Sequence, residues 1–342
     1  MPRIAIDLLG GDAGPGVVAD ALAHLFASPD SDSISLCIVG PLDLARDLLS
    51  ERGVDVDARE NVNVLDASGC VPMSASSHET LHLVREDPTL TSVVGVDAVR
   101  ARRADAFVSI GHTGATVAAS AYGLGRLPGM GRLGLAVELP SLRGPVILLD
   151  SGAAPHATSH DLLRFAAAGS AYAQSLGIDR PRIGLLSIGG ERGKGDHLRK
   201  QTDALLDEHF PRGYVGLVEG HDLVGEPQAD IEHANVVVVD GFTGNVALKS
   251  MEGALRWSVA AMARAYGAVE PALEVLRTSH FLSGGALLGL SGNVVVGHGA
   301  SSATEVLACI QRAAAMHSGR VVDRVRDALA AFGPLDSRGE PQ

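Results

Sequence analysis

The stretch from Val236 to Lys249 reads V-V-V-V-D-G-F-T-G-N-V-A-L-K, and it decides the fold. Four consecutive valines are typical of a strand buried on both faces of a parallel sheet, which predicts Asp240 at the carboxyl end of that strand. Open α/β sheets bind their ligands at this end. The glycines that follow permit a sharp turn and a close approach to a ligand, and the short polar side chains between them suit the start of a helix. The sequence therefore predicts a turn that holds an anion or a polar group, with an ordinary capped loop as the alternative.

An apolar strand followed by a glycine-rich or polar turn occurs six times along the chain. Because the carboxyl ends of parallel strands meet at one edge of a doubly wound sheet, these turns are predicted to converge on a shared pocket. For any single turn, the alternative is that glycine only allows the chain to turn and binds no ligand. The other five strands are predicted at 4–7, 106–109, 146–149, 183–186 and 294–296. The candidate binding residues at the strand ends are Asp7, Gly10, Gly11, Asp12, Gly111, Thr113, Gly114, Gly241, Thr243, Gly244, Asn245 and Ser301.

Size and composition favour an α/β protein with a large core. The 342 residues are enough for one large α/β unit or two closely joined lobes, and we predict a single domain over residues 1–332. Aromatic residues make up only 4% of the chain while glycine reaches 41 residues, so the core must be built mostly from closely packed Ala, Val, Leu and Ile. This composition favours an α/β sheet over a β-sandwich.

Charge and cysteine content limit which binding partners and which cellular compartment are expected. A net charge of −12, without a stripe of Lys and Arg, argues against binding to nucleic acid and against electrostatic adsorption to anionic lipid. Three cysteines, Cys37, Cys70 and Cys309, are far apart and are predicted to be reduced thiols of a cytosolic protein. The N-terminus already reads as a strand, and no apolar run reaches the ~20 residues of a membrane span. We therefore predict a soluble, cytoplasmic protein.

Helices and strands alternate along most of the chain. Apolar residues at helical spacing predict helices near 16–26, 42–49, 93–102 and 115–123, and further strands are predicted at 34–39 and 62–65. The stretch 68–91, between the strand at 62–65 and the helix near 93–102, is polar and less regular. Such alternation is typical of βαβ units and a parallel sheet.

Residues 251–283 depart from this alternation. An apolar stripe along Met251–Tyr266 predicts a helix, and a second helix from Ala272 predicts a hairpin that projects from the sheet. The stripe is typical of a core or a subunit interface, and a projecting apolar hairpin usually needs a partner. The tail 333–342, rich in Pro, Gly and charge, is predicted to be disordered.

Six motifs in this order resemble those of the PlsX-type phosphate acyltransferases of bacterial lipid synthesis. They read I-A-I-D-x-x-G-G-D-x-G-P, F-V-S-x-G-x-T-G-A, G-L-L-x-I-G, D-G-F-T-G-N-V-x-L-K, G-G-A-L-L-G and H-G-x-S, and they span Ile4 to about Ile310. The resemblance implies transfer of a fatty acyl group from acyl carrier protein to inorganic phosphate. It also implies a three-layer α/β/α fold with a mostly parallel sheet, related to phosphotransacetylases and isocitrate-dehydrogenase-like folds. A homodimer formed partly through the hairpin is implied as well.

Five residues are candidates for catalytic roles in that reaction. Lys249, one turn along its helix from the D-G-F-T-G-N turn, is expected to offset phosphate charge, with a solvated helix lysine as the alternative. Lys194 lies on a loop after a strand and is expected to close over a thioester or phosphate, although loop lysines are usually only solvated. His298 suits a general acid for the leaving thiolate, or a ring bonded to a neighbouring carbonyl. His112 is a candidate donor to an oxyanion, and Asp240 is expected to orient a lysine or a histidine.

The reaction requires little besides positioning. Phosphate is already a competent nucleophile, so backbone N–H groups, a cation and donors for the developing oxyanion suffice. No G-x-S-x-G elbow or Ser/His/Asp set stands out in the sequence, which agrees with catalysis without a covalent enzyme nucleophile. Strand-end carboxylates without a His/Cys cluster are a weak metal signal, so neither a metal nor a cofactor is predicted.

Several polar positions depart from the family pattern. Ala13 stands where the family usually has histidine, His112 where it has asparagine, and 85–89 where it has a basic stretch; 151–156 and 299–302 differ too. These changes leave open a divergent housekeeping enzyme or a paralogue that uses another donor or acceptor, such as a CoA thioester or a specialised carrier protein. The hairpin also looks short for the family, so any membrane association is expected to be peripheral at most.

Two rivals come from other functional classes. A dehydrogenase on the related fold is disfavoured because the opening G-G-D-A-G-P lacks the G-x-G-x-x-G fingerprint. A non-catalytic paralogue that only binds a carrier protein would bind without cleaving a thioester.

Overall fold

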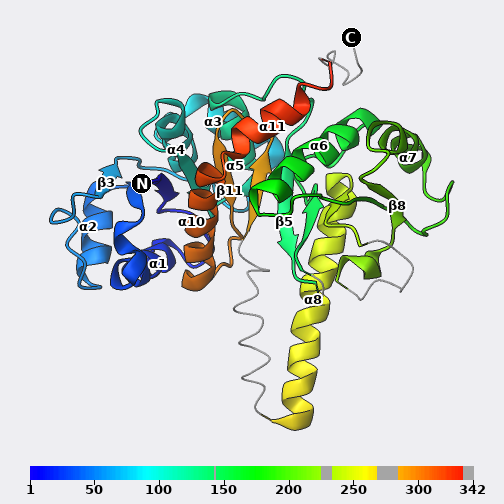
Figure 1. Cartoon of the computed structure of the whole chain (residues 1–342). Coiled ribbons are helices and arrows are strands. Elements are labelled where there is room, and N and C mark those ends of the chain that lie inside the picture. The colour runs from blue at the N-terminus through cyan, green and yellow to red at the C-terminus, as the bar shows by residue number, and fades with distance from the viewer. Residues whose placement is uncertain (142–143, 225–232, 268–283, 334–342) are drawn as a thin grey trace. The chain divides into compact units, whose positions relative to one another are not determined.

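The computed structural model describes residues 1–141, 144–224, 233–267 and 284–333, and Figure 1 traces its helices and strands. The chain divides into two compact units. Unit 1 comprises Met1–Leu127 and Leu282–Val322, and unit 2 comprises Pro128–Phe281 and Asp323–Gln342. Each unit contains a mostly parallel sheet with its own helices. A single domain over residues 1–332 stays a prediction.

The sheet of unit 1 has the strand order β3-β2-β1-β4-β11-β10. All neighbours are parallel except β10 and β11, which pair antiparallel. β1 lies centrally, where Ile4 pairs with Leu36 of β2 on one side and with Ala106 of β4 on the other. The strands are β1 (Arg3–Asp7), β2 (Ser35–Val39), β3 (Val62–Leu65), β4 (Ala106–Ser109), β10 (Gly285–Leu288) and β11 (Asn293–Val296).

Helices cover both faces of this sheet. α10 packs on β1 and β4 together with α1, while α4 and α5 pack on the other face, which gives three layers. α10 begins with a capping box in which Ser302 and Glu305 satisfy each other's backbone N–H groups. The elements are α1 (Pro15–Ala27), the 3₁₀ turn η1 (Pro29–Asp32), α2 (Leu42–Ser50), α3 (Ser77–Glu86), α4 (Thr91–Arg100), α5 (Thr113–Gly123) and α10 (Ala303–Ser318).

The strands of unit 2 have the order β5-β6-β9-β7-β8. β5 and β6 pair antiparallel, and the other neighbours are parallel. α6 packs on β6 and β9, α7 packs on β7 and β8, and α8 contacts β6. The elements are β5 (Gly134–Leu139), β6 (Val146–Leu149), α6 (Ser159–Ser175), β7 (Ile183–Leu186), α7 (His197–His209), β8 (Tyr214–Val218), the 3₁₀ turn η2 (Gly220–Leu223), β9 (Val236–Val238), α8 (Gly241–Tyr266) and α11 (Val321–Leu329).

The cores are built from small and branched side chains. β4, β6, β7, β9 and β11 are buried at every residue, as expected for parallel strands covered on both faces. Close packing depends on glycine at some positions: a Cβ on Gly95 of α4 would lie 2.1 Å from the ring of Phe107. The prediction of a closely packed core with few aromatic residues is confirmed.

The six predicted strands with polar ends are confirmed, and so is the α/β class. In the predicted irregular stretch 68–91, however, the structure contains α3 and the start of α4. α3 begins after Ser76, whose hydroxyl accepts the N–H of Glu79 over 3.3 Å. The predicted helix at Met251–Tyr266 is the second part of one 26-residue helix, α8, which begins at Gly241 and extends away from the sheet of its own unit (Figure 1). The second helix of the predicted hairpin and the tail 334–342 lie outside the described residues.

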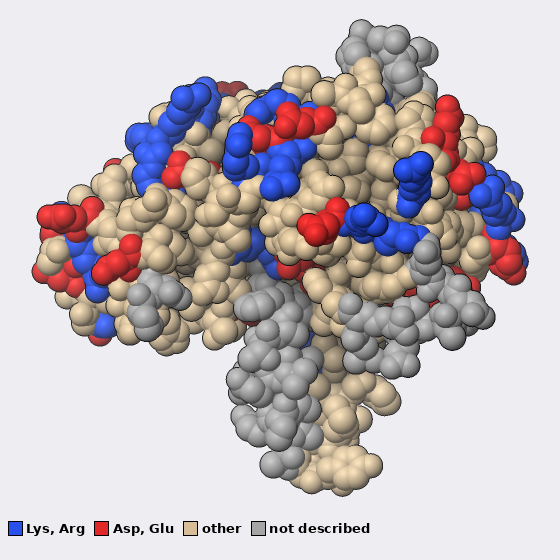
Figure 2. Space-filling view, viewed as in Figure 1, with Lys and Arg blue, Asp and Glu red and all other residues tan. Residues whose placement is uncertain are grey.

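Figure 2 shows Lys and Arg side chains interspersed with Asp and Glu over the face in view. Across the whole chain, 28 basic side chains stand against 40 acidic ones. Phosphate backbones are bound by clustered cations, so this distribution agrees with the prediction that the chain does not bind nucleic acid, which stays a prediction. Among the described residues, no helix has the length and apolar character needed to cross a bilayer.

Candidate functional site

The topology of unit 1 creates a crevice at the carboxyl ends of β1 and β4. The chain runs from β1 to β2 and β3 on one side of β1, and later places β4 on its other side. At such a reversal the turns after the two neighbouring strands diverge, which is where open α/β sheets bind ligands. Asp7 ends β1 and Ser109 ends β4, so both residues lie at this switch point.

Asp7 and Ser109 are buried and tie the two strand ends together. The hydroxyl of Ser109 donates to Oδ2 of Asp7 over 2.8 Å and accepts the N–H of Gly111 over 3.1 Å. Oδ1 of Asp7 accepts the N–H of Leu9 over 3.0 Å. Burial raises the pKa of Asp7 above its ordinary value, and the bonds from Ser109, Thr91 and Leu9 offset part of this rise.

Three of the predicted turns are packed together in unit 1. A Cβ on Gly10 would lie 2.7 Å from the backbone nitrogen of Gly111, so only glycine fits there. Gly11 has a φ of +95° and lies against the carbonyl oxygen of Gly299, which accepts the N–H of Asp12 over 2.7 Å. The turns after β1, β4 and β11 therefore meet.

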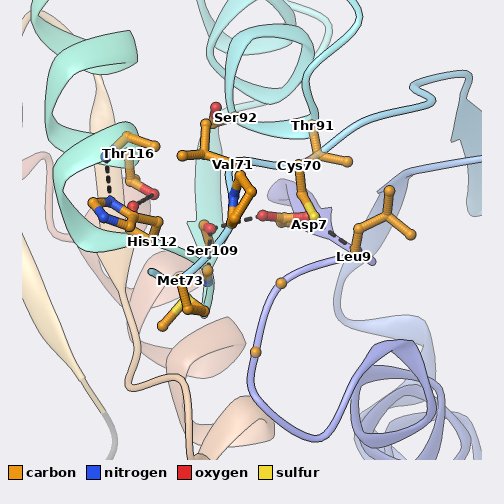
Figure 3. Close-up of a pocket in the computed structure, with 15 residues that line it drawn as sticks. Asp7, Leu9, Cys70, Val71, Met73, Thr91, Ser92, Ser109, His112 and Thr116 are labelled. Atoms are coloured by element: carbon orange, nitrogen blue, oxygen red, sulfur yellow. Dashed lines mark hydrogen bonds between the residues drawn. The ribbon is translucent and has the colours of Figure 1, made fainter. Parts of the chain in front are cut away.

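A cavity of about 70 Å³ opens beside these turns (Figure 3). Its lining joins the carboxylate of Asp7 and several hydroxyl groups to an apolar wall. The lining side chains come from β1, β4, the starts of α4 and α5, and the segment 70–73 that follows β3. None of the lining residues is a lysine or an arginine. They include Asp7, Cys70, Val71, Met73, Ser92 and Ser109.

His112 caps α5. Its Nδ1 accepts the N–H of Ala115 over 3.2 Å, and its Nε2 lies 3.3 Å from the carbonyl oxygen of Ala75. Because Nδ1 is an acceptor, the proton of the neutral ring is on Nε2 and is donated to Ala75. Both ring nitrogens thus have partners in the protein, while Thr113 and Gly114 lie exposed in the first turn of the helix. Donation from His112 to an oxyanion stays a prediction.

His298 lies exposed in the turn after β11. Its backbone N–H donates to the hydroxyl of Ser301 over 3.2 Å, and its Nδ1 accepts the N–H of Ala300, also over 3.2 Å. Nε2 therefore carries the ring proton and has no hydrogen-bond partner among the described residues. The buried Ser301 shapes the turn, and the ring of His298 keeps one donor for a ligand.

In unit 2, Asp240 pairs with Arg199 of α7, a residue that the sequence did not single out. Arg199 and Asp240 form a buried ion pair, and Nη2 of Arg199 also donates to the hydroxyl of Thr243 over 3.0 Å. Nε of Arg199 donates to the carbonyl of Leu186 over 3.4 Å, which joins the ends of β7 and β9. The partner of Asp240 is thus an arginine, where a lysine or a histidine was expected.

The charge of Asp240 is stabilised by its neighbours. Burial alone would raise its pKa, but the N–H and hydroxyl of Thr243 and the guanidinium of Arg199 outweigh burial and hold the pKa below its ordinary value. Asp240 is therefore an ionised N-cap of α8, and it accepts the N–H of Thr243 over 3.0 Å.

The D-G-F-T-G-N segment forms the first turn of α8 and packs on the turn after β6. A Cβ on Gly244 would lie 1.8 Å from the carbonyl oxygen of Asp150, and one on Gly241 would lie 2.7 Å from that of Ala154. Neither glycine has a positive φ. Both glycines therefore allow the helix to approach a neighbouring turn. The N–H of Gly241 is already bound to the carbonyl of Ala154, over 2.9 Å.

The turn after β6 is itself rigid. Asp150 is fully buried and accepts four backbone N–H groups at 2.6 to 2.9 Å. Burial raises its pKa, and these four bonds offset part of the rise. The side-chain amide of Asn245 donates to the carbonyl of Ser151 over 3.2 Å and so fixes α8 to the same turn.

The two candidate lysines of unit 2 differ in their surroundings. Nζ of Lys249 lies 3.0 Å and 2.9 Å from the two carboxylate oxygens of Glu252, whose side chain is mostly buried. Lys194 is exposed on the loop after β7, and its side chain makes no hydrogen bond or ion pair with the described residues. Lys194 is therefore the more available cation.

Sequence reasoning missed Arg199 because it weighed turns and not helix interiors. A signal was present: Arg199 lies three residues before Thr202 and seven before Leu206, on the buried side of α7. A basic residue in that row needs an acidic partner. Among the described residues, no cluster of three or more His, Cys, Asp or Glu is arranged to hold a metal ion.

Solved structures with this fold include two kinds of enzyme. A phosphotransacetylase from Streptococcus pyogenes aligns with a TM-score of 0.61 at 19% identity, over 92% of this chain and 94% of its own. The 4-hydroxythreonine-4-phosphate dehydrogenase from Klebsiella pneumoniae aligns with a TM-score of 0.54 at 13% identity, over 92% and 98%. These likenesses confirm the predicted fold relationship to phosphotransacetylases.

Curated sequences give a closer likeness. A phosphate acyltransferase from Thermus thermophilus is 36% identical over 96% of this chain and 99% of its own length. One from Pseudomonas putida is 38% identical over 91% and 92%. The sequence pattern of the family described as "Fatty acid synthesis protein" matches residues 2–324. The chain therefore belongs to the fatty acid synthesis protein family, the family of the PlsX-type phosphate acyltransferases.

Proposed function

We propose that this protein transfers a fatty acyl group from the thioester of acyl carrier protein to inorganic phosphate, and that the acyl phosphate formed feeds phospholipid synthesis. The observation that carries this proposal is the near full-length likeness to phosphate acyltransferases at 36% to 38% identity. The fold adds a second support, since phosphotransacetylases share it.

In the proposed reaction, a phosphate oxygen attacks the carbonyl carbon of the thioester. A carbon–oxygen bond forms, the carbon–sulfur bond breaks, and the electron pair leaves with sulfur. The thiolate takes up the proton that hydrogen phosphate loses, so the products are the acyl phosphate and the carrier thiol. No electrons are exchanged with an outside reagent. Phosphate is an adequate nucleophile, so the protein must mainly align the reactants and stabilise the oxyanion.

Phosphate needs positive charge, and in unit 2 Lys194 on the loop after β7 and Lys249 on α8 supply it. Among the described residues, the side chain of Lys194 has no partner and that of Lys249 pairs with Glu252. We assign phosphate binding to these two lysines, with Thr243 and Asn245 at the start of α8. The Asp240–Arg199 pair holds this region in place, because it joins α7, the end of β7 and the start of α8.

Residues of unit 1 are assigned to the donor. His298 offers Nε2–H to the leaving sulfur as a hydrogen-bond donor, a role that fits the tautomer set by Ala300. Gly10, Gly11, Asp12 and the turn 111–114 shape the binding surface beside it. The turn that contains Ser301 orients His298.

A homodimer is proposed from the surface of α8. The stripe from Met251 to Tyr266 has no buried member, although it lies on one face of a well-formed helix. Met262 and Tyr266 are exposed and Met251, Leu255 and Val259 are half-buried, and apolar side chains left accessible in such a row favour association. Figure 2 shows mostly uncharged side chains along the part of this helix in view. We propose a cytoplasmic dimer whose contact with membranes is peripheral at most.

Trapping the product tests the proposed function. The protein is incubated with palmitoyl-acyl carrier protein, inorganic phosphate and hydroxylamine, and the acyl hydroxamate is measured. Hydroxamate above the level seen without phosphate is expected, because hydroxylamine intercepts acyl phosphate. A parallel reaction with palmitoyl-CoA tests the choice of carrier. If neither donor gives phosphate-dependent hydroxamate, the transferase assignment is refuted.

A further inference from the structure

We propose that one face of α8 is the docking surface for the acidic carrier protein that delivers the acyl group. The inference rests on the proposed function for the identity of the donor and adds the surface that binds it. This basic–aromatic face consists of Phe242, Val246, Arg256, Trp257 and Arg264, all on α8 of unit 2.

The apolar members of the basic–aromatic face form a row. With 3.6 residues per turn, positions 242, 246 and 257 fall within about 60° of one another around the helix axis. Phe242, Val246 and Trp257 are 67%, 51% and 72% exposed. Single exposed apolar side chains are common on protein surfaces, but two aromatic rings and a valine aligned on one helix mark a surface for a partner.

The charge of this face is positive. α8 contains three basic residues and a single acidic one, Glu252, in a chain whose net charge is −12. Glu252 is buried, and its carboxylate lies 2.9 Å from Nζ of Lys249 and 4.0 Å from Nη2 of Arg256. One buried carboxylate thus serves two cations, and Arg256 and Arg264 remain exposed. A partner that presents carboxylates around apolar side chains matches such a face.

The face is separate from the stripe proposed for the dimer. The stripe from Met251 to Tyr266 lies about 160° away around the helix axis, nearly on the opposite side of α8. A dimer formed through that stripe therefore leaves the basic–aromatic face accessible.

The arrangement of the side chains favours a protein partner over lipid. A helix that lies on a bilayer separates its apolar side from its basic side. On this face Arg256 is next to Trp257 in the sequence, and Arg264 falls in line with Val246, so cations and apolar groups share one side. Apolar contacts bordered by charges are typical of an interface between proteins.

The face begins beside the residues assigned to phosphate. Phe242 and Val246 flank Thr243 in the first turns of α8. At 1.5 Å per residue, Arg256 lies about 20 Å farther along the helix. A carrier protein holds its acyl group at the end of a long flexible arm. A docking surface that starts at the phosphate site and extends away from it suits a donor of this kind.

Trp257 is the only tryptophan of the chain, so its fluorescence reports contact at this face. The full-length protein, without phosphate, is titrated with a palmitoyl-acyl carrier protein that lacks tryptophan. The emission of Trp257 should move to shorter wavelength and saturate, because binding removes water from an exposed indole. The concentration that gives half of the shift should rise at least about threefold when the ionic strength is raised from about 0.05 M to about 0.5 M, since salt screens exposed charges.

Arg256→Glu and a matched control test the charge. Reversing this charge places like charges opposite each other, so the half-saturating concentration and KM for palmitoyl-acyl carrier protein should rise roughly 10-fold with kcat unchanged. Arg212→Glu makes the same change in net charge at an exposed arginine just before β8. Because β7, β8 and β9 are parallel, Arg212 lies at the edge of these strands opposite to the start of α8, and its variant should shift neither value more than about twofold. Equal effects of the two variants would contradict the assignment.

Other occupants of the face are separate outcomes of the titration. A shift of Trp257 emission with vesicles of phosphatidylglycerol and none with the carrier protein would assign the face to lipid. A shift caused only by a higher concentration of the protein itself would assign the face to a second copy, and either result overturns the proposal. An active transferase in the hydroxamate assay whose Trp257 emission is unchanged by the carrier protein would refute the inference and leave the proposed function standing. A saturable shift without phosphate-dependent hydroxamate would support the face and refute the transferase.

Discussion

The Gly244→Ala substitution tests the close packing of α8 on the turn after β6. The added Cβ would lie 1.8 Å from the carbonyl oxygen of Asp150 and 2.9 Å from a methyl group of Val239, whereas real Cβ contacts essentially never fall below 3.0 Å. The helix and the turn must separate by more than 1 Å. Asp150 cannot yield easily, because four backbone N–H groups hold its side chain.

The magnitude follows from two opposing effects. Overpacking of a rigid contact costs about 3 kcal/mol, while alanine in a helix gains about 1 kcal/mol over glycine. Gly244→Ala should therefore lower the free energy of unfolding by roughly 2 kcal/mol. Because the same shift moves Thr243 and Lys249, kcat/KM for phosphate should also fall.

Gly253→Ala on the same helix is the matched control. Nothing lies within 4 Å of a Cβ at that position, so only the gain in helix propensity applies, up to about 1 kcal/mol of stabilisation. Urea unfolding followed by circular dichroism measures both variants against the wild type. If Gly244→Ala were as stable as Gly253→Ala, the close contact with Asp150 would not exist in solution and the reasoning would fail.

Four further predictions concern single residues. Lys194→Met should lower kcat/KM for phosphate roughly 10- to 100-fold, the loss of one charge-assisted hydrogen bond, and should change the free energy of unfolding by less than about 0.5 kcal/mol; unchanged kinetics with phosphate varied would contradict its role. Arg199→Met leaves Asp240 buried without its cation and should cost about 3–5 kcal/mol of stability at neutral pH. Because the pKa of Asp240 in the folded protein is held below 3.8, ionised Asp240 stabilises the fold above that pH. This stabilisation is lost as the pH falls through the lowered pKa, so acid should reduce the free energy of unfolding less in Arg199→Met than in the wild type. The pKa of Asp7 in the folded protein is raised above 3.8, so protonated Asp7 stabilises the fold below pH 3.8, and this stabilisation is lost as the pH rises through the raised pKa. Over that pH range the free energy of unfolding of the wild type should fall relative to that of Asp7→Asn. The difference between the two proteins would not change with pH if burial had no effect on Asp7. Val259→Glu should convert a dimer to a monomer in light scattering, and a dimeric variant would refute the α8 interface.

The fold was predictable because its signals are local. Runs such as Val236–Val239 and the glycines after them mark strand ends, and these strands occur where expected. α3 was missed because only Thr80 and Val84 of its ten residues are buried, which leaves a weak apolar period. The length of α8 was underestimated because Gly241 and Gly244 indicate a turn, whereas the structure uses them for close contact inside a helix.

The site was predictable only in part, because its key contacts join residues far apart in the sequence. The Asp240–Arg199 pair spans 41 positions and links a strand end to another helix. The Asp7–Ser109 bond spans 102 positions. Neither residue of a pair can be recognised from its own position in the sequence, because a buried charge is stable only beside a partner, and the sequence does not show which residue that partner is. The strand-end residues themselves were recognisable, because glycine and short polar groups there have few structural alternatives.

The hydrogen bonds of the site also bear on how the reaction proceeds. Ser109 is the serine best placed at the switch point, yet its proton is directed to Asp7 and its oxygen accepts from Gly111. A nucleophilic serine needs a base to take its proton in the transition state, and the nearest ring, His112, has both nitrogens engaged elsewhere. Ser109 and His112 therefore lack the arrangement of a nucleophile and its base, whereas the side chain of Lys194 and Nε2 of His298 have no hydrogen-bond partner among the described residues. Direct attack by phosphate on a positioned thioester is the chemistry that such an arrangement supports.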